Sequence, residues 1–527
     1  MLRKRIAAMI CASAVMGGAL YSPAGYGVPT AFAAGSITQA EGKDTTNELD
    51  TSYYYYDNQS KIVDSYLYES GENTLTRVEY TESELIAEDI DMSTGKLLKS
   101  RTLEMSLPIF GAFYAGKDYN FVVTGQNNPD ESNDVKILSV TRYSKDFKSS
   151  KTVGLYGRNT SIPFCAGSCK MTEAGGKLYI HTCHQMYVSK DGLNHQANMS
   201  YVLDEATMAF EQEHYKVGSS SEAGRISNAF GYASHSFDQF IVTDGEAVYA
   251  YDHGDAYPRA LRLHKYTLSD GRLSYTNLVN IPGSIGDNYT GALTGDVELS
   301  KDNVLIGVKM ADMSSGSLDN YTDLKDIYII VMPKSGIGGS TSPKLVNLTN
   351  YTGKDQSSAS SLRQNSAPKM VKINDNKFIV MWQECVGSSK WWIDTVTDKV
   401  TKIAVIDGSG KLIGSVMESS EITLSDCDPI LCSDGKVRWY AASGGAPVLY
   451  AIDPNAPVTF GEEVIKGDAD KNGTVDVSDV LLIQQHIAGW SVDIDLNAAD
   501  VTGDAKANID DALMIQQHIA GWDVTFK

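Results

Sequence analysis

Most of the chain alternates short apolar runs with polar turns, a pattern that favours β-strands over helices. Between residues 34 and 457 the apolar runs are brief, and they are alternating or rich in β-branched residues. Alternation with a period of two turns one face of a strand toward a core, and an Asp-Gly pair is typical of a two-residue hairpin turn. Five such pairs separate the runs: Asp191-Gly192, Asp244-Gly245, Asp270-Gly271, Asp407-Gly408 and Asp434-Gly435. The pattern predicts a large, mainly β domain, which we place at residues 45–457.

Similar segments recur through this region in units of roughly 55–75 residues. Residues 176–180, 247–251, 376–382 and 435–440 look alike, and a second hairpin follows each, as at Thr401–Val416. About six units are visible, and residues 53–105 are a candidate for a seventh. Such units repeated around an axis are typical of a β-propeller, so we expect six or seven blades. The alternative is a pair of β-sandwich domains in tandem.

The C-terminal segment has a different, helical pattern that occurs twice. The run Leu481–Trp490 recurs as Leu513–Trp522, with nine of ten residues identical at an offset of 32 residues. An acidic loop precedes each run. Ser478 and Asp510 stand where the helices are expected to begin, and the later positions Gly489 and Gly521 are candidate C-caps that follow the last turns.

The first loop has the spacing of a calcium site. Oxygen-bearing side chains stand at positions 1, 3, 5, 9 and 12, and glycine stands at position 6. A loop of 12 residues wraps Ca²⁺ with oxygens from alternate positions, including the backbone carbonyl of position 7. The expected ligands are Asp468, Asp470, Asn472, Thr474, Asp476 and Asp479.

The second loop is a weaker match to the same pattern. Thr502 stands at position 3, and Ala505 replaces the glycine at position 6, where a left-handed backbone is costly for alanine. We therefore expect two bound calcium ions, with lower affinity at this loop. The expected ligands are Asp500, Thr502, Asp504, Lys506 through its carbonyl, Asn508 and Asp511.

This duplicated loop–helix unit resembles the type I dockerin module, over residues 467–524. The resemblance implies a calcium-folded domain that attaches a secreted protein to a cohesin domain of a scaffoldin, as in cellulosomes. It also implies that loop positions 10 and 11 and the following helix contact the cohesin. Carried over, these residues are Val477, Ser478, Gln484, Gln485, Ile509, Asp510, Gln516 and Gln517. The helix residues are identical between the copies, whereas the loop pairs differ.

The N-terminus has the pattern of an export signal over residues 1–33. Arg3, Lys4 and Arg5 precede an apolar stretch that is too short to span a bilayer, and Ala31-Phe32-Ala33 offers a cleavage site. We therefore expect a secreted, extracellular protein, held in a cell-surface complex through the scaffoldin. Residues 458–466 are expected to be a short linker.

The charge of the chain is concentrated near its C-terminus. The net charge is -21, and beyond the expected export signal no run of Lys and Arg would supply a basic patch, which argues against a nucleic-acid partner. Residues 461–527 contain 13 acidic and 4 basic side chains, a net of -9. This share belongs to the predicted calcium loops.

The chemistry of the β domain is less clear from the sequence, and no catalytic residue is identified. Six cysteines follow the signal sequence and allow disulfides, buried thiols, or a metal cluster of Cys165, Cys169 and Cys183 with His181 and His184. We expect acidic clusters beside inner strands at 252–255, 296–298 and 426–428. Candidate sugar-stacking residues are Trp391 and Trp392, with Trp382 nearby. The expected role is polysaccharide binding, and the alternatives are a glycoside hydrolase or polysaccharide lyase, or a spacer.

Overall fold

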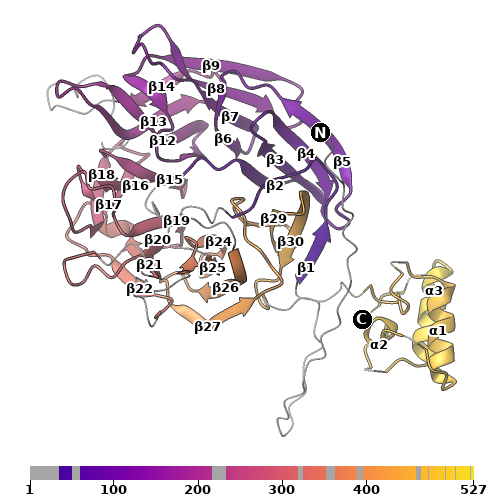
Figure 1. Ribbon diagram of the computed structural model, residues 1–527. Helices are drawn as coiled ribbons and strands as arrows, with labels where there is room; N and C mark the ends of the chain where they lie inside the picture. The colour runs from indigo at the N-terminus through magenta and orange to yellow at the C-terminus, as the bar shows by residue number, and fades with distance from the viewer. Residues whose placement is uncertain are drawn as a thin grey trace, which may run out of the picture. The chain divides into compact units, whose positions relative to one another are not determined.

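The computed structural model describes residues 35–49, 60–215, 233–318, 324–351, 362–387, 396–457 and 465–526, the last range without 473, 493, 505 and 523. The β-rich part is a ring of seven antiparallel sheets, a seven-bladed β-propeller (Figure 1). The prediction of a mainly β domain with six or seven blades is confirmed, and the number of blades is seven. The predicted signal sequence lies outside the described residues.

In six blades the strands follow chain order outward from the central channel, and in the seventh β1 is the outermost strand. In the third and sixth blades two short strands, β10 with β11 and β23 with β24, share the innermost position, so β12 and β25 are second from the channel. The first three blades comprise β2 (Ser65–Gly71), β3 (Thr74–Tyr80), β4 (Leu85–Asp91) and β5 (Leu97–Leu103); β6 (Ile109–Ala115), β7 (Tyr119–Gly125), β8 (Lys136–Ser144) and β9 (Ser150–Tyr156); and β10 (Thr160–Pro163), β11 (Cys169–Ala174), β12 (Lys177–Val188), β13 (Asn194–Asp204) and β14 (Phe210–His214). The next three comprise β15 (Ser236–Thr243), β16 (Ala247–Asp255), β17 (Arg259–Thr267) and β18 (Leu273–Asn280); β19 (Ala292–Leu299), β20 (Asn303–Met310), β21 (Asp326–Pro333) and β22 (Lys344–Asn347), with a short 3-10 turn η1 (Lys334–Gly336); and β23 (Leu362–Asn365), β24 (Lys369–Asn374), β25 (Lys377–Gly387), β26 (Val396–Ile406) and β27 (Leu412–Ser419). The seventh comprises β28 (Ile430–Leu431), β29 (Val437–Ser443), β30 (Ala446–Ile452) and β1 (Gly35–Gln39).

The recurring segments of the sequence are the second strands of their blades. They fall on β12, β16, β25 and β29, and each Asp-Gly pair lies between two consecutive strands of one sheet. The second strand has a neighbour on each side and is packed between blades on both faces. Its side chains are therefore buried almost without alternation, as in β16, where all nine residues are buried.

The ring is closed by strands from its two ends. β1 pairs antiparallel with β30, from Gly35 opposite Ile452 to Gln39 opposite Val448. The seventh blade therefore contains both ends of the β domain, and β1 lies ahead of residue 45, where the sequence placed the start of that domain. β1 thereby covers the outer edge of β30 and becomes the outer edge strand of this blade.

A buried ionic cluster lies at the same junction, between the first and seventh blades. Arg77 is fully buried and contacts Glu79 at 3.1 Å and Glu88 at 2.6 Å. Tyr440 of β29 donates a hydrogen bond to Glu79 at 3.1 Å, and the Tyr440 ring lies 5.4 Å from the guanidinium carbon. Thr45, in the segment after β1, donates to the same Glu79 carboxylate at 2.7 Å. The cluster thus joins three segments that are distant in sequence.

The C-terminal module is a pair of helices with a short one between them. α1 (Val477–Ile487) packs against α3 (Ile509–Ile519), and α2 (Leu496–Ala499) precedes the second loop. The apolar core includes Val480, Ile483 and Ile515. The structure describes no helix that is both long and apolar enough to cross a membrane.

The helix ends of this module match the sequence in part. Gly489 and Gly521 follow the helices with φ of +78°, as expected of the residue after a C-cap. The N-caps are Asp476 and Asn508, whose carboxylate and amide oxygens accept from the backbone N–H two residues on, at 2.7 Å. Each cap therefore lies two residues before the position that the sequence favoured, because loop position 9 serves as the cap.

Removing the Arg77 cation should destabilise the propeller. The change Arg77→Ala leaves two buried carboxylates without a counter-charge, and we expect the free energy of unfolding to fall by about 3–5 kcal/mol. Urea unfolding followed by tryptophan fluorescence measures the loss. The matched control is Lys148→Ala, because Lys148 pairs with Asp146 but is 77% exposed. The control should change stability by less than about 0.5 kcal/mol. A similarly small change for Arg77→Ala would contradict the role given to the cluster.

Candidate functional site

The first acidic loop gathers three carboxylates at one point. Ligand atoms of Asp468, Asp470 and Asp479 all lie within 4.8 Å of one another. The Asp479 carboxylate is fixed by two backbone N–H donors, of Asp470 at 3.1 Å and Asp476 at 2.8 Å. Burial raises the pKa of Asp479, and the Asp470 charge raises it further. Such a group of oxygens is the donor set that a hard cation such as Ca²⁺ prefers.

The second loop repeats this geometry. Asp500, Asp504 and Asp511 lie within 4.8 Å of one another. The position-12 residue, Asp511, accepts from the backbone N–H of Thr502 at 2.9 Å and of Asn508 at 2.8 Å. The carboxylates are thus held by the same backbone bonds in both copies, and the donor set again fits Ca²⁺.

The remaining predicted ligands lie around these two groups. Asn472 Oδ1 accepts from the Thr474 backbone N–H at 2.9 Å, and Asp476 and Asn508 cap the helices that follow. The Thr502 hydroxyl lies 3.4 Å from an Asp500 oxygen. Lys506 is exposed. Gly473 and Ala505, at position 6 of the two loops, lie outside the described residues.

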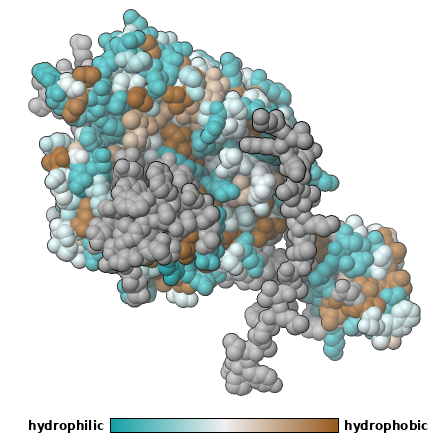
Figure 2. Space-filling model, in the orientation of Figure 1, coloured by the Kyte–Doolittle hydropathy of each residue, from teal (hydrophilic) through white to brown (hydrophobic). Residues whose placement is uncertain are grey.

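The two helices turn matching apolar residues to solvent. Val477 is 69% exposed and its counterpart Ile509 is 60% exposed, while Trp490 and Trp522 are 63% and 64% exposed. The same holds for a further set of equivalent positions: Leu481 and Leu513, and Ile487 and Ile519. Figure 2 shows apolar residues on the visible side of this module. Large exposed apolar residues repeated on equivalent faces indicate a surface for a protein partner.

The predicted partner residues share this exposed side in most cases. Six of them are exposed and two, Gln485 and Gln517, are half-buried. The exposed six are Val477, Ser478, Gln484, Ile509, Asp510 and Gln516. The sequence analysis did not single out Leu481 and Leu513, although each lies four residues after an exposed apolar residue and so shares its helix face.

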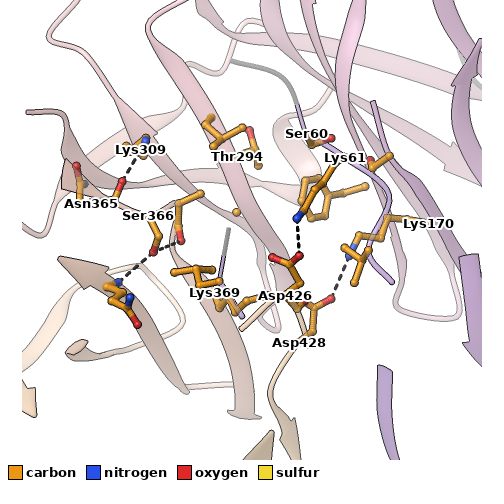
Figure 3. A pocket seen from close by; sticks show the side chains of 18 of the residues that line it. Ser60, Lys61, Lys170, Thr294, Lys309, Asn365, Ser366, Lys369, Asp426 and Asp428 are labelled. Carbon is orange, nitrogen blue, oxygen red and sulfur yellow. Dashed lines mark hydrogen bonds and ion pairs between the residues drawn. The ribbon is translucent and has the colours of Figure 1, made fainter. Parts of the chain in front are cut away.

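The propeller has a cavity at one end of its central channel. Its volume is about 160 Å³, and it is lined by residues at the start of the innermost strands or just before them. Among them are Lys170 of β11, Thr294 of β19, Lys369 of β24, and Asp426 and Asp428 ahead of β28 (Figure 3). Because these strands run side by side around the channel, their first residues meet at one point.

Ion pairs connect the charged residues of this cavity. Lys170 and Lys369 contact the two oxygens of Asp428 at 3.0 and 2.8 Å, and Lys61 contacts Asp426 at 2.7 Å. Burial raises the pKa of Asp428, but the charges of Lys170 and Lys369 outweigh that effect and hold it well below its usual range.

Two more carboxylates, Asp296 and Glu298, lie on the innermost strand β19. Burial and the Asp428 charge raise the pKa of Asp296 to about 7, and burial and the Asp296 charge raise the pKa of Glu298 to about 8. The expectation that 296–298 and 426–428 lie beside inner strands therefore agrees with the structure.

The cluster 252–255 departs from that expectation. It lies on β16, the second strand of its blade, and Asp252 is fully buried. Asp252 accepts from Asn198 at 3.0 Å and Ser236 at 2.7 Å, and His181 lies 3.2 Å away. The cluster binds two blades together. No local sequence pattern indicates this contact, because the partners of Asp252 come from distant strands.

None of the six cysteines in the described part of the chain is joined in a disulfide: Cys165, Cys169, Cys183, Cys385, Cys427 and Cys432. His181 and His184 bond to different hydroxyls, of Ser200 at 2.7 Å and Thr160 at 2.6 Å. Over the described residues, the groups close enough to hold a metal are the two in the C-terminal loops. The structure thus favours buried thiols over a bridge or a metal cluster.

Of the three tryptophans considered for sugar stacking, the structure describes one. Trp391 and Trp392 lie outside the described residues. Trp382 is fully buried in the apolar core between blades, and its ring N–H donates to the Tyr351 hydroxyl at 3.0 Å. Trp382 is therefore part of the blade core and is not available to stack on a sugar.

Comparison with solved structures finds only distant likenesses. A Synechocystis ACO mutant has a TM-score of 0.32 and 13% identity, over 56% of this chain and 63% of that one, so this chain spans less than two thirds of its length. Oligogalacturonate lyase from Vibrio parahaemolyticus has a TM-score of 0.42 and 8% identity, and the match covers 80% of this chain and 98% of that protein. A quinohemoprotein alcohol dehydrogenase from Pseudomonas putida HK5 has a TM-score of 0.39 and 9% identity, and the match covers 88% of this chain and 83% of that protein. These likenesses bear on neither substrate nor activity.

The family comparison concerns the C-terminal module alone. The search of curated proteins finds no significant match to this chain. The type I dockerin domain family matches residues 466–520, which hold both acidic loops and both long helices. The C-terminal module of this protein is a type I dockerin domain.

Proposed function

We propose that this protein is a secreted subunit of a cohesin–dockerin complex similar to a cellulosome. Its dockerin domain binds two calcium ions and docks onto a cohesin domain of a scaffoldin, and the propeller is the cargo. The observation that carries the proposal is the pair of acidic loops, each with three carboxylates within 4.8 Å at the start of a helix.

Calcium is the expected cofactor because the bare loops hold like charges together. Three carboxylates within 4.8 Å repel one another, and a bound divalent cation reverses that repulsion. Asp479 and Asp511 stand at position N3 of their helices, where each also accepts from the backbone N–H of the N-cap residue. Binding of the ion and formation of the helix start are therefore coupled.

The cohesin contact is assigned to the exposed helix faces. In addition to the residues implied by the resemblance, the proposed surface includes Leu481, Leu513, Trp490 and Trp522, which are exposed at equivalent positions of the two copies. An apolar centre with polar neighbours such as Gln484 is typical of a specific protein interface.

For the cargo we propose binding of polysaccharide, supported by the cavity at the end of the channel. One observation favours the alternative of a glycoside hydrolase or polysaccharide lyase. The pKa of Asp296 is raised to about 7 and that of Asp428 is lowered, and carboxylates with divergent pKa values are typical of an acid and a base. Release of reducing ends or of unsaturated products from a polysaccharide panel by the full chain separates catalysis from binding alone.

Calcium should fold the dockerin domain in two unequal steps. Titration of the full chain, after removal of metal, should show a tighter site with the ligands of Asp468–Asp479 and a weaker site at Asp500–Asp511. A hundredfold excess over Kd should stabilise the domain by about 2.7 kcal/mol per site, seen as a shift of its melting transition. Asp468→Ala should remove the tight step, and Thr502→Asp should strengthen the weak one. Two equal tight sites would contradict the expected difference, and unchanged helix content in excess EGTA would contradict the coupling.

A charged residue on both helix faces should abolish docking. The double variant Leu481→Asp with Leu513→Asp places two carboxylates where apolar side chains meet the cohesin, and we expect affinity for a responsive type I cohesin to fall at least about a hundredfold. Calcium-dependent helix content should stay unchanged, because both residues point away from the core. The control is Lys148→Asp on the propeller, which should bind as the parent does. Retained affinity of the double variant would place the contact elsewhere.

A further inference from the structure

We propose that the cavity at the end of the propeller channel binds a single carboxylated sugar residue, a uronic acid, and that lysine ammonium groups hold its carboxylate. This inference rests on the proposed binding of polysaccharide by the propeller and names the residue that is recognised. It is carried by the charge, the fixed geometry and the size of the cavity.

The cavity carries an excess of positive charge in an acidic protein. Its charged lining residues are four lysines and two aspartates, whereas the chain as a whole has a net charge of -21. The lysines are Lys61, Lys170, Lys309 and Lys369, and the aspartates are Asp426 and Asp428. The lining therefore holds two more lysines than aspartates. A ligand carboxylate offsets part of that excess in a partly desolvated site, where charge-assisted hydrogen bonds are strongest.

The lysines are held in place before any ligand arrives. Asp428 bridges Lys170 and Lys369, at 3.0 and 2.8 Å, and the Lys369 ammonium also donates to the Asp426 carbonyl at 2.9 Å. The Lys309 ammonium donates to the Asn365 carbonyl at 3.0 Å. Because these bonds fix long side chains, a ligand loses less entropy in ordering them, which favours binding.

The acidic neighbours decide which lysines face the carboxylate. Lys61 and Asp426 border a second pocket whose other charged residues are all acidic: Glu48, Asp64, Glu79 and Glu82. That side repels an anion. The carboxylate is therefore assigned to Lys170, Lys309 and Lys369, which do not border that second pocket. Burial and the Asp428 charge raise the pKa of the nearby Asp296, which favours its neutral form.

The cavity has room for one ring. Its volume is about 160 Å³, and a protein cavity of about 150 Å³ holds a six-membered benzene ring. A hexuronate carries more non-hydrogen atoms than benzene, so its remaining groups extend out of the cavity. One part of the lining is apolar: Leu49, Val63, Phe240, Leu293 and Ala367. Another part offers hydroxyl and amide groups: Ser60, Thr294, Asn365, Ser366 and Gln383. A pyranose has the same division between its C–H face and its hydroxyl edge, and a uronic acid adds the carboxylate.

Calorimetry on the full chain tests the assignment. The probes are sodium D-galacturonate and sodium D-glucuronate, each compared with its neutral counterpart, D-galactose or D-glucose. We expect at least one uronate to bind about tenfold or more tightly than its neutral counterpart, and this preference to shrink as NaCl is raised. No binding of either uronate or of polygalacturonate, or equal affinity for acid and neutral sugar, overturns the proposal.

Variants locate the site. Lys170→Gln keeps the length and polarity of the side chain but removes its charge, and it should weaken uronate binding about tenfold. Lys148→Gln, an exposed lysine on the propeller, should leave it unchanged. Unchanged binding by a folded Lys170→Gln variant overturns the assignment to this cavity. If that variant does not fold, Lys309→Gln, which removes the charge of another lining lysine, should weaken uronate binding, and unchanged binding by this folded variant overturns the assignment.

Two further measurements are needed. The first distinguishes a free sugar acid from a polysaccharide end as the ligand, and the second distinguishes this inference from the proposed cohesin attachment. Binding of polygalacturonate as well as the free acid assigns the cavity to the end of a chain, and binding of the free acid alone assigns it to the monosaccharide. Excess EGTA should abolish cohesin binding and leave uronate binding intact. Binding of neutral polysaccharide without any uronate preference overturns this inference while the proposed polysaccharide binding stands.

Discussion

The pairing of β1 with β30 joins residues that lie more than 400 positions apart, and the propeller depends on it. Without β1 the seventh blade has three strands, one of them only two residues long, and β30 loses its outer partner. The Arg77 cluster adds a second connection at the same place, between β3, β29 and the segment after β1. The channel exists only when the ring is closed, so the cavity and its charged lining depend on this junction.

The acidity of the chain has two different physical roles. In the dockerin domain, carboxylates gather in two loops with the geometry of a cation site, and Asp479 and Asp511 also accept from the backbone N–H of the helix N-caps. In the propeller, several acidic side chains are buried against partners, such as Asp252 with its hydroxyl, amide and imidazole neighbours. The cavity at the channel end differs, because its lining holds four lysines and two aspartates. The net charge of the chain therefore combines two acidic loops, a buried structural network and a lysine-rich cavity.

The two parts also differ in how a partner is expected to meet them. The dockerin helices bury one face in a small core and leave large apolar residues such as Trp490 and Trp522 in water, a costly arrangement that a protein partner relieves. The propeller buries most of its large aromatic residues between blades and presents a small cavity whose lining combines apolar residues with lysines and aspartates. Such a division fits a protein in which one part provides attachment and the other recognises a small group.

The sequence by itself determined the local features. Asp-Gly turns placed the hairpins, repeated segments marked the second strands, and the spacing of Asp468 to Asp479 identified a calcium loop, because each depends on neighbours within a few residues. Only the tertiary structure decided the number of blades, the use of β1 in the last blade, the burial of Asp252 and the meeting of Lys170, Lys369 and Asp428. These depend on contacts between segments as far apart as β11 and β28, which hydrophobic period and turn chemistry do not encode. The helix N-caps were predicted only approximately, because the residue at loop position 9 belongs to the acidic loop and also caps the helix.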